Sequence, residues 1–220
     1  MPNNAQAQAA IQRPLQAPRA RDYEYAVILG FIIGLFLIPT EMNLAKQHHI
    51  SVYIYWLTFF AFPVLAVIGL FITRLLFSRI AVLWQFSKFA LIGISNTAIN
   101  FGVLNFLSFA SGIDTGLLPA IFAAVAFFAA TTNSYIWNSH WSFKNNNQRT
   151  PAEFLQFFVI TFIGSIINIG VVYLVVNKIH HGANISPQLW LNIANVIATL
   201  IVMFWDFSGF KFIVFRSAEK

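Results

Sequence analysis

The side chains suited to chemistry are few in this sequence, and the most suggestive are cations at the ends of apolar segments. Of 220 residues, 13 are Lys or Arg and 7 are Asp or Glu. Four cations lie at segment ends that are predicted below to face the cytoplasm: Lys88, Lys144, Lys211 and Arg216. There they can hold an anionic group by charge-assisted hydrogen bonds. Alternatively, they only determine topology and extend toward lipid head groups.

A stripe of small and polar residues follows the helical spacing i, i+3, i+4, i+7 in the third apolar segment. It consists of Gly93, Asn96, Thr97 and Asn100, and the matching positions of the fifth segment are Thr161, Gly164, Ser165 and Asn168. Because lipid disfavours polar side chains, both stripes are predicted to face the inside of a helix bundle. They serve either helix packing through hydrogen bonds or a polar groove that passes a head group.

The acidic residues form no catalytic pattern. No two have the spacing of an Asp-x-Asp metal pair, and neither a nucleophile motif nor a phosphate-binding glycine loop is present, so neither an enzyme nor a cofactor is predicted. Asp206 stands apart, about one turn from the predicted inner end of the last segment. It is either an ion-pair partner of Lys211 or of another interfacial base, or a proton- or gate-coupled acid. Asn138 either caps the fourth segment or belongs to the polar groove.

Metal binding is not predicted. Cysteine is absent, and the adjacent histidines His48-His49 and His180-His181 have no carboxylate partner and point in divergent directions.

The composition requires a membrane. The chain is 58% hydrophobic and 9% charged, whereas soluble domains carry about 25% charged residues. Six apolar segments are each long enough to cross a hydrocarbon core about 30 Å thick; they are 25–43, 52–77, 86–110, 117–137, 154–177 and 188–210. We therefore predict an all-α membrane protein with about six transmembrane helices. The first segment is the weakest because Pro39 interrupts its end, and a span is favoured there over a re-entrant hairpin.

Basic residues predict the orientation. With the N-terminus inside, 11 Lys and Arg lie on the cytoplasmic side and two, Lys46 and Lys178, on the outer side. This asymmetry places both termini in the cytoplasm and the protein in the inner membrane. Because the cations are dispersed over several stretches, nucleic acid is not a predicted partner. Residues 1–21 are predicted to be a disordered cytoplasmic arm rather than a signal peptide.

An internal repeat is predicted from two constant offsets. Segments three and five match at an offset of 68 residues, where Asn100 and Gly102 equal Asn168 and Gly170. Segments four and six match at an offset of 72, where Tyr135, Phe143 and Lys144 correspond to Phe207, Phe215 and Arg216. Two helices per repeat return the chain to the same side, so the last four helices are predicted to form two parallel repeats.

Three motifs resemble the GtrA family of small membrane proteins: FSKFALIG at 86–93 continuing to NTAIN at 96–100, SYIWNSHWSFK at 134–144, and DFSGFKFIVFR at 206–216. The resemblance covers about residues 84–217, which suggests a four-helix domain there after two extra helices in 22–83. The sequence departs from the family pattern at Ser139, where a basic residue is common and which His140 follows, and at Asp206, where asparagine is common.

The resemblance implies a role with polyprenyl-phosphate-linked sugars in cell-surface polysaccharide synthesis. The leading hypothesis is a non-enzymatic carrier or flippase, whose cations hold the phosphate while the sugar passes the polar stripes. The alternative is a non-transporting subunit that anchors or regulates a membrane glycosyltransferase. A small proton-coupled exporter is disfavoured because no acid is predicted at mid-membrane. Gly30 and Gly34 form a GxxxG run, which fits either a homo-oligomer or packing within the chain.

Overall fold

The computed structural model describes residues 20–48, 51–77, 80–113, 115–143, 150–179 and 187–216. In these residues the chain is helical and contains no strand. Six helices are long and apolar enough to cross a membrane, which confirms the predicted all-α membrane fold. The parallel arrangement of the last four helices stays a prediction, as do the cytoplasmic termini.

The helices extend beyond most of the predicted apolar segments, because polar residues at the segment ends continue the helical turns. The elements are α2 (Ala20–His48), α3 (Tyr53–Phe77), α4 (Ala81–Ser111), α5 (Leu118–Trp137), η1 (Asn138–Ser142), α6 (Pro151–Lys178), α7 (Pro187–Gly209) and η2 (Phe210–Val214). The predicted interruption at Pro39 is not present, since α2 continues through it. Membrane helices tolerate such a proline because neighbouring groups satisfy the freed backbone carbonyl.

Two compact units divide the chain at residue 130. The N-terminal unit contains α2, α3, α4 and the first part of α5; the C-terminal unit contains the end of α5, η1, α6, α7 and η2. The division falls inside the predicted domain 84–217, because α4 packs with the two preceding helices. The predicted domain boundaries themselves stay a prediction.

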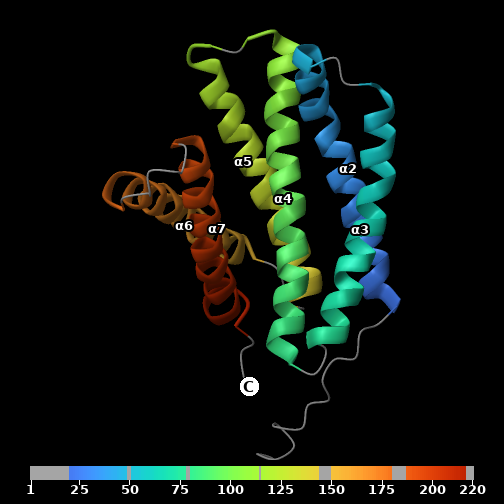
Figure 1. Ribbon diagram of the computed structural model, residues 1–220. Helices are drawn as coiled ribbons and strands as arrows, with labels where there is room; N and C mark the ends of the chain where they lie inside the picture. The colour runs from blue at the N-terminus through green and yellow to red at the C-terminus, as the bar shows by residue number, and fades with distance from the viewer. Residues whose placement is uncertain are drawn as a thin grey trace, which may run out of the picture. The chain divides into compact units, whose positions relative to one another are not determined.

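The N-terminal unit is built on α2, which lies beside both α3 and α4 (Figure 1). Glycines allow the close approach: a Cβ at Gly30 would overlap Pro63 Cα, and a Cβ at Gly102 would overlap the Phe36 carbonyl oxygen. The GxxxG run at Gly30 and Gly34 therefore packs α2 against α3 within the chain. Farther along α2, Asn43 Nδ2 donates to Asn105 Oδ1 of α4 at 2.8 Å.

The C-terminal unit is centred on the contact between α6 and α7. Thr150 caps the start of α6 by accepting a 3.1 Å hydrogen bond from the Glu153 amide, and Pro151 follows at the first helical position. Trp205 Nε1 of α7 donates to the Ile160 carbonyl at 3.1 Å. This hydrogen bond fixes the register of α7 against α6.

Both α5 and α7 end in a π-helical turn. The turns are η1 and η2, and they lie 72 residues apart, which is the offset found between segments four and six in the sequence. In each, the amide of the closing phenylalanine donates to the carbonyl five residues earlier, from Phe143 to Asn138 and from Phe215 to Phe210. Such turns are rare and are frequent at functional sites.

Candidate functional site

The proposed phosphate ligand Lys88 is buried and already has an anionic partner. Its Nζ donates a 2.7 Å hydrogen bond to Asp22 Oδ1, from the first turn of α2. Lys88 is 2% exposed and Asp22 4% exposed. The ammonium group also lies 5.1 Å from the centre of the Trp84 ring. A phosphate that reached Lys88 would therefore have to share it with Asp22 or displace that carboxylate.

A second cation of the N-terminal unit contacts the same turn of α2, through an uncharged hydroxyl group. Arg74, in the last turn of α3, donates from Nη1 to the Tyr23 hydroxyl at 3.2 Å. Asp22 and Tyr23 are consecutive, so one turn of α2 binds a cation from α3 and another from α4. The sequence analysis missed Asp22, Tyr23 and Arg74 as site residues. The sequence contained one signal for this pair. A lysine among apolar residues, such as Lys88, requires a counter-ion, and Asp22 is an acid near the start of an apolar segment.

The other predicted phosphate ligands belong to the C-terminal unit. Lys211 lies half-buried in η2, with Nζ 5.6 Å from the centre of the Phe207 ring and 5.8 Å from that of Phe212. Arg216 is exposed just beyond η2. Lys144 lies outside the described residues. Of the predicted phosphate ligands that the structure describes, Lys211 and Arg216 form neither an ion pair nor a hydrogen bond with the described residues, in contrast to Lys88.

Asp206 faces α6 rather than Lys211. A Cβ at Gly164 would lie 2.8 Å from Asp206 Oδ1, so the glycine leaves the room that the carboxylate occupies. Oδ1 is buried and has no hydrogen-bond partner in the described residues. Among the described residues, no ion pair joins Asp206 to Lys211; the role of Asp206 stays a prediction. Asp206 also lies farther from the helix end than predicted, because η2 continues the helix to Val214, about two turns beyond Asp206.

Two more polar side chains of the C-terminal unit have buried oxygen atoms without a partner. Thr161 Oγ1 lies one turn before Gly164 on α6, and Asn138 Oδ1 lies at the start of η1. Asn138 is 0% exposed, and its Nδ2 donates to the Ser134 carbonyl at 2.9 Å. Because the helix continues as a π turn at Asn138, this residue does not cap the fourth segment. Unsatisfied buried oxygen atoms are costly, which marks these positions as functional candidates.

An aromatic cluster surrounds this region of the C-terminal unit. Phe157 of α6 stacks on Phe210 of η2 with ring centroids 4.0 Å apart, and Tyr135 donates from its hydroxyl to Glu153 Oε1 at 2.8 Å. The remaining members are Phe143, Phe154, Phe207 and Phe215. The packed rings exclude water from the ends of α5 and α7, so polar groups inside the unit are in an apolar environment.

The predicted polar stripes are partly exposed in the structure. On α4, Asn96 and Asn100 are half-buried, while Thr97 is exposed and donates to the Gly93 carbonyl at 3.1 Å. On α6, Ser165 and Asn168 are half-buried. The face of α4 that packs on α2 is a different one and contains Lys88, Ile92, Ser95, Ile99 and Gly102. The inward orientation of the stripes stays a prediction.

No metal centre is found in the described part of the chain. There, no three His, Asp or Glu side chains are placed to hold an ion. His49, His180 and His181 lie outside the described residues, and the side chain of His48 is not described.

Comparison with known proteins agrees with the resemblance seen in the motifs. The family model described as GtrA/DPMS, transmembrane domain, matches residues 88–215, more than half of the chain. YngA of Bacillus subtilis (strain 168), an uncharacterized membrane protein, is 29% identical over 133 residues, which cover 60% of this chain and 80% of YngA. No solved structure matches the chain. The family match begins at Lys88, so α2 and α3 lie outside it.

Proposed function

Because the chain belongs to the GtrA/DPMS transmembrane domain family, we propose that it is a carrier that moves polyprenyl-phosphate-linked sugars across the cytoplasmic membrane. Membership of this family is consistent with handling of polyprenyl-phosphate sugars. Beyond such handling, we propose that the protein transports these lipids, a step in which no covalent bond is broken. The sugars would serve the synthesis of cell-surface polysaccharides.

The observation that carries this proposal is the polar interior of the C-terminal unit. Asn138, Thr161 and Asp206 each bury an oxygen atom that has no hydrogen-bond partner in the described residues. Such an atom costs about 1–3 kcal/mol in an apolar environment. Sugar hydroxyls are hydrogen-bond donors, so a sugar passing between α6 and α7 would satisfy these acceptors. A helix pair selected only for packing would gain stability from apolar side chains at the same positions.

The cations at the end of the same unit supply the second part of the mechanism. Lys211 and Arg216 lie at and beyond η2, the end predicted to face the cytoplasm. They would hold the lipid phosphate there by charge-assisted hydrogen bonds. The prenyl tail would stay in apolar surroundings while the sugar follows the polar side chains. Asn96, Thr97, Asn100, Ser165 and Asn168 are the further positions assigned to this groove.

Reconstitution tests the proposal. The purified chain is placed in liposomes with a polyprenyl-phosphate sugar labelled on the sugar, and the label accessible to a membrane-impermeant oxidant is followed over time. We expect the label of the inner leaflet to become accessible with wild type and much more slowly with Asp206→Leu. Ser208→Ala changes an exposed residue of the same helix and is the matched control. Rates equal to those of protein-free liposomes would refute transport.

One observation favours the second candidate function, a non-transporting subunit that anchors a glycosyltransferase. Phe212 and Ile213 of η2 are 65% and 61% exposed, beside Lys211. Apolar side chains next to a cation, at the end predicted to face the cytoplasm, are suited to docking a membrane-bound enzyme. This function predicts co-purification with a glycosyltransferase that is lost on Phe212→Ala, and no movement of the labelled lipid in liposomes.

A further inference from the structure

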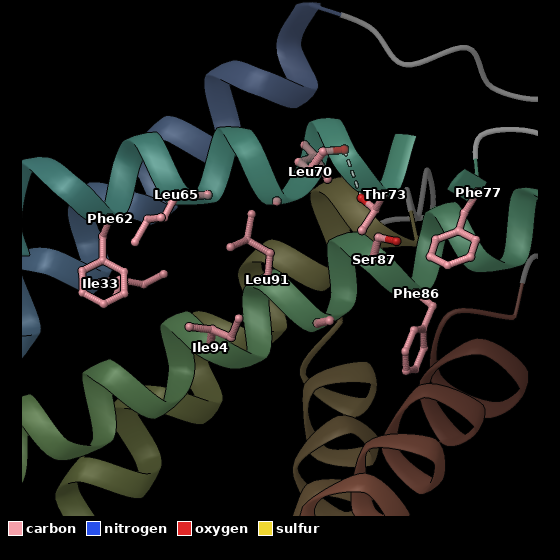
Figure 2. A pocket seen from close by; sticks show the side chains of 13 residues that line it. Ile33, Phe62, Leu65, Leu70, Thr73, Phe77, Phe86, Ser87, Leu91 and Ile94 are labelled. Atoms are coloured by element: carbon pink, nitrogen blue, oxygen red, sulfur yellow. Dashed lines mark hydrogen bonds between the residues drawn. The ribbon is translucent and has the colours of Figure 1, made fainter. Parts of the chain in front are cut away.

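The N-terminal unit contains an apolar groove between α3 and α4, with a volume of about 390 Å³. Figure 2 shows side chains from both helices facing one another across it. Its α3 wall comprises Phe62, Leu65, Ala66, Gly69, Leu70, Thr73 and Phe77; its α4 wall comprises Phe86, Ser87, Ala90, Leu91 and Ile94. Ile33 of α2 lies at its base. At the rim, Leu65 and Ile94 are 56% and 54% exposed.

The groove exists because α3 and α4 each pack closely on α2 rather than on each other. Gly30 and Gly34 bring α2 against the backbone of α3, and Gly102 brings α4 against the backbone of α2. Contacts of α2 with α3 and α4 are accordingly extensive, whereas α3 and α4 meet only sparsely. The separation leaves space beside α3, since a Cβ at Gly69 would meet nothing within 4 Å.

The walls require no hydrogen-bonding occupant. The groove contains two hydroxyl groups, and both donate to carbonyls of their own helices: Thr73 to Leu70 at 3.0 Å and Ser87 to Leu83 at 2.8 Å. All three helices are candidate membrane spans, so the surroundings of the groove are hydrocarbon rather than water. A hydrocarbon chain is the occupant that matches both the lining and the solvent.

Two cations lie at one end of this groove. Arg74 falls between the lining residues Thr73 and Phe77, in the last turn of α3, and Lys88 follows the lining residue Ser87 on α4. Asp22 neutralises Lys88, and Arg74 uses one of its N–H donors on the uncharged Tyr23 hydroxyl. The end of the groove therefore has a surplus positive charge, and the guanidinium retains donors suited to a phosphate.

We propose that this groove is a second lipid site, additional to the phosphate site proposed at Lys211 and Arg216: it binds the prenyl tail of a polyprenyl phosphate, with the phosphate at Arg74. The substrate class rests on the proposed function. The helix pair α2–α3, which lies outside the family match, thereby supplies a tail-binding wall to the α4 helix of the family domain. The chemistry that recognises the lipid is a guanidinium–phosphate contact at one end and apolar contact along the rest.

The shape of the walls favours a branched chain over a straight acyl chain. Ala66, Gly69 and Ala90 form notches between bulky side chains such as Phe62, and on α3 the notches recur about once per helical turn of 5.4 Å. A prenyl chain carries a methyl branch on every isoprene unit, so it can place branches in successive notches. A straight acyl chain would leave these notches empty and lose the dispersion contacts.

The test compares two glycines in equivalent settings. Gly69 lies in the groove and Gly170 lies on α6; both are exposed, and a Cβ at either meets nothing within 4 Å. Gly69→Leu fills the groove, whereas Gly170→Leu adds the same side chain elsewhere. Each groove variant is made in the full-length protein that also carries Lys211→Gln and Arg216→Gln, so that the phosphate site proposed at η2 does not contribute, and bound polyprenyl monophosphate is quantified by native mass spectrometry. We expect Gly69→Leu to weaken retention at least about tenfold and Gly170→Leu to leave it unchanged.

Further measurements identify the lipid that occupies the groove and the contact made by its head group. Arg74→Gln is expected to weaken retention of polyprenyl monophosphate about 10-fold or more, but not that of the uncharged polyprenol. An anionic phospholipid with straight acyl chains is the competitor, and we expect it to displace the polyprenyl lipid poorly. Should Gly69→Leu lower the melting temperature, Ala90→Leu on the opposite wall provides the groove-filling variant. Each variant is first compared with wild type by size-exclusion chromatography.

The possible results distinguish failure of the groove assignment from failure of the proposed function. Binding of polyprenyl monophosphate that survives both groove-filling variants overturns the groove and leaves the proposed function intact. Equal binding of the straight-chain phospholipid in the groove also overturns the proposal. If wild type retains no polyprenyl monophosphate at all, the proposed function fails together with the groove assignment.

Discussion

Phe143 stacks on Phe215, with ring centroids 5.2 Å apart and an interplanar angle of 24°. The two residues close η1 and η2 and lie 72 residues apart in the sequence. Tyr135 stacks on Phe215, and Phe143 packs on Phe207. The offset of 72 relates Tyr135 to Phe207 and Phe143 to Phe215, so it converts one of these contacts into the other. Contacts that exchange in this way are expected about a two-fold axis. A duplication would produce this reciprocity, and the duplication itself stays a prediction.

The Phe143–Phe215 contact should be measurable as a coupling energy. In a double-mutant cycle with Phe143→Leu and Phe215→Leu, we expect a coupling of about 0.5–1.5 kcal/mol in the free energy of unfolding in detergent. The control cycle pairs Phe143→Leu with Phe212→Leu, since Phe212 is 65% exposed and should show no coupling. Additive effects in both cycles would contradict a specific ring contact.

Close packing of α2 on α3 predicts a sharp penalty for one methyl group. The Cβ of Gly30→Ala would overlap Pro63 Cα, a backbone atom that cannot move aside alone. Overpacking of this kind costs about 1–3 kcal/mol, so the melting temperature should fall. Gly69→Ala is the control on the partner helix, because its Cβ meets nothing within 4 Å. Equal melting temperatures for the two variants would contradict the close approach.

Removing a buried oxygen atom that has no hydrogen-bond partner should raise the stability of the protein and slow its transport activity. Thr161→Val keeps the shape of the side chain and removes a buried hydroxyl oxygen that has no partner in the described residues. Removing it should leave the protein as stable or up to about 1–3 kcal/mol more stable, while transport of the labelled lipid slows. A matched change, Thr199→Val, lies on an exposed position of α7 and should alter neither. Loss of stability in Thr161→Val would instead favour a packing role.

The spans were predictable because hydropathy and length are local properties of the chain. The π turns were not, since their i→i+5 bonds leave no mark in an apolar pattern. The partner of Lys88 was also missed, because Asp22 lies 66 residues away and belongs to a helix outside the motifs. The same holds for Asp206: its motif was visible in sequence, but its position against Gly164 depends on how α6 and α7 cross.

The predicted orientation is open to a direct test. The distribution of 11 cytoplasmic and two outer Lys and Arg predicts that both ends of the chain lie inside. Epitope tags at residues 1 and 220 should both be protected from protease in right-side-out vesicles and both be cleaved in inverted ones. Cleavage of one tag alone in either preparation would require an odd number of spans.

Lys88 and Lys211 both occur in the motifs that resemble the family, but the structure predicts different effects for their substitution. Lys88→Gln leaves Asp22 buried without its cation, which typically costs about 3–5 kcal/mol, so the protein should melt at a lower temperature. Replacing the pair by apolar residues, Asp22→Leu with Lys88→Met, should recover much of that loss. Glu24→Gln, two residues along on the exposed face of α2, is the control and should melt like wild type.

Lys211→Gln should behave in the opposite way, because no described carboxylate depends on this ammonium group. Folding should be unchanged, while affinity for a polyprenyl phosphate falls about 10- to 150-fold, the effect of losing one charged hydrogen-bond partner. The Lys211→Gln and Arg216→Gln double variant should fall further, since the two cations end the same helix. Unchanged lipid affinity in this double variant, with native folding, would remove the C-terminal phosphate site and shift the weight to the glycosyltransferase-anchoring function, in which these cations contact protein.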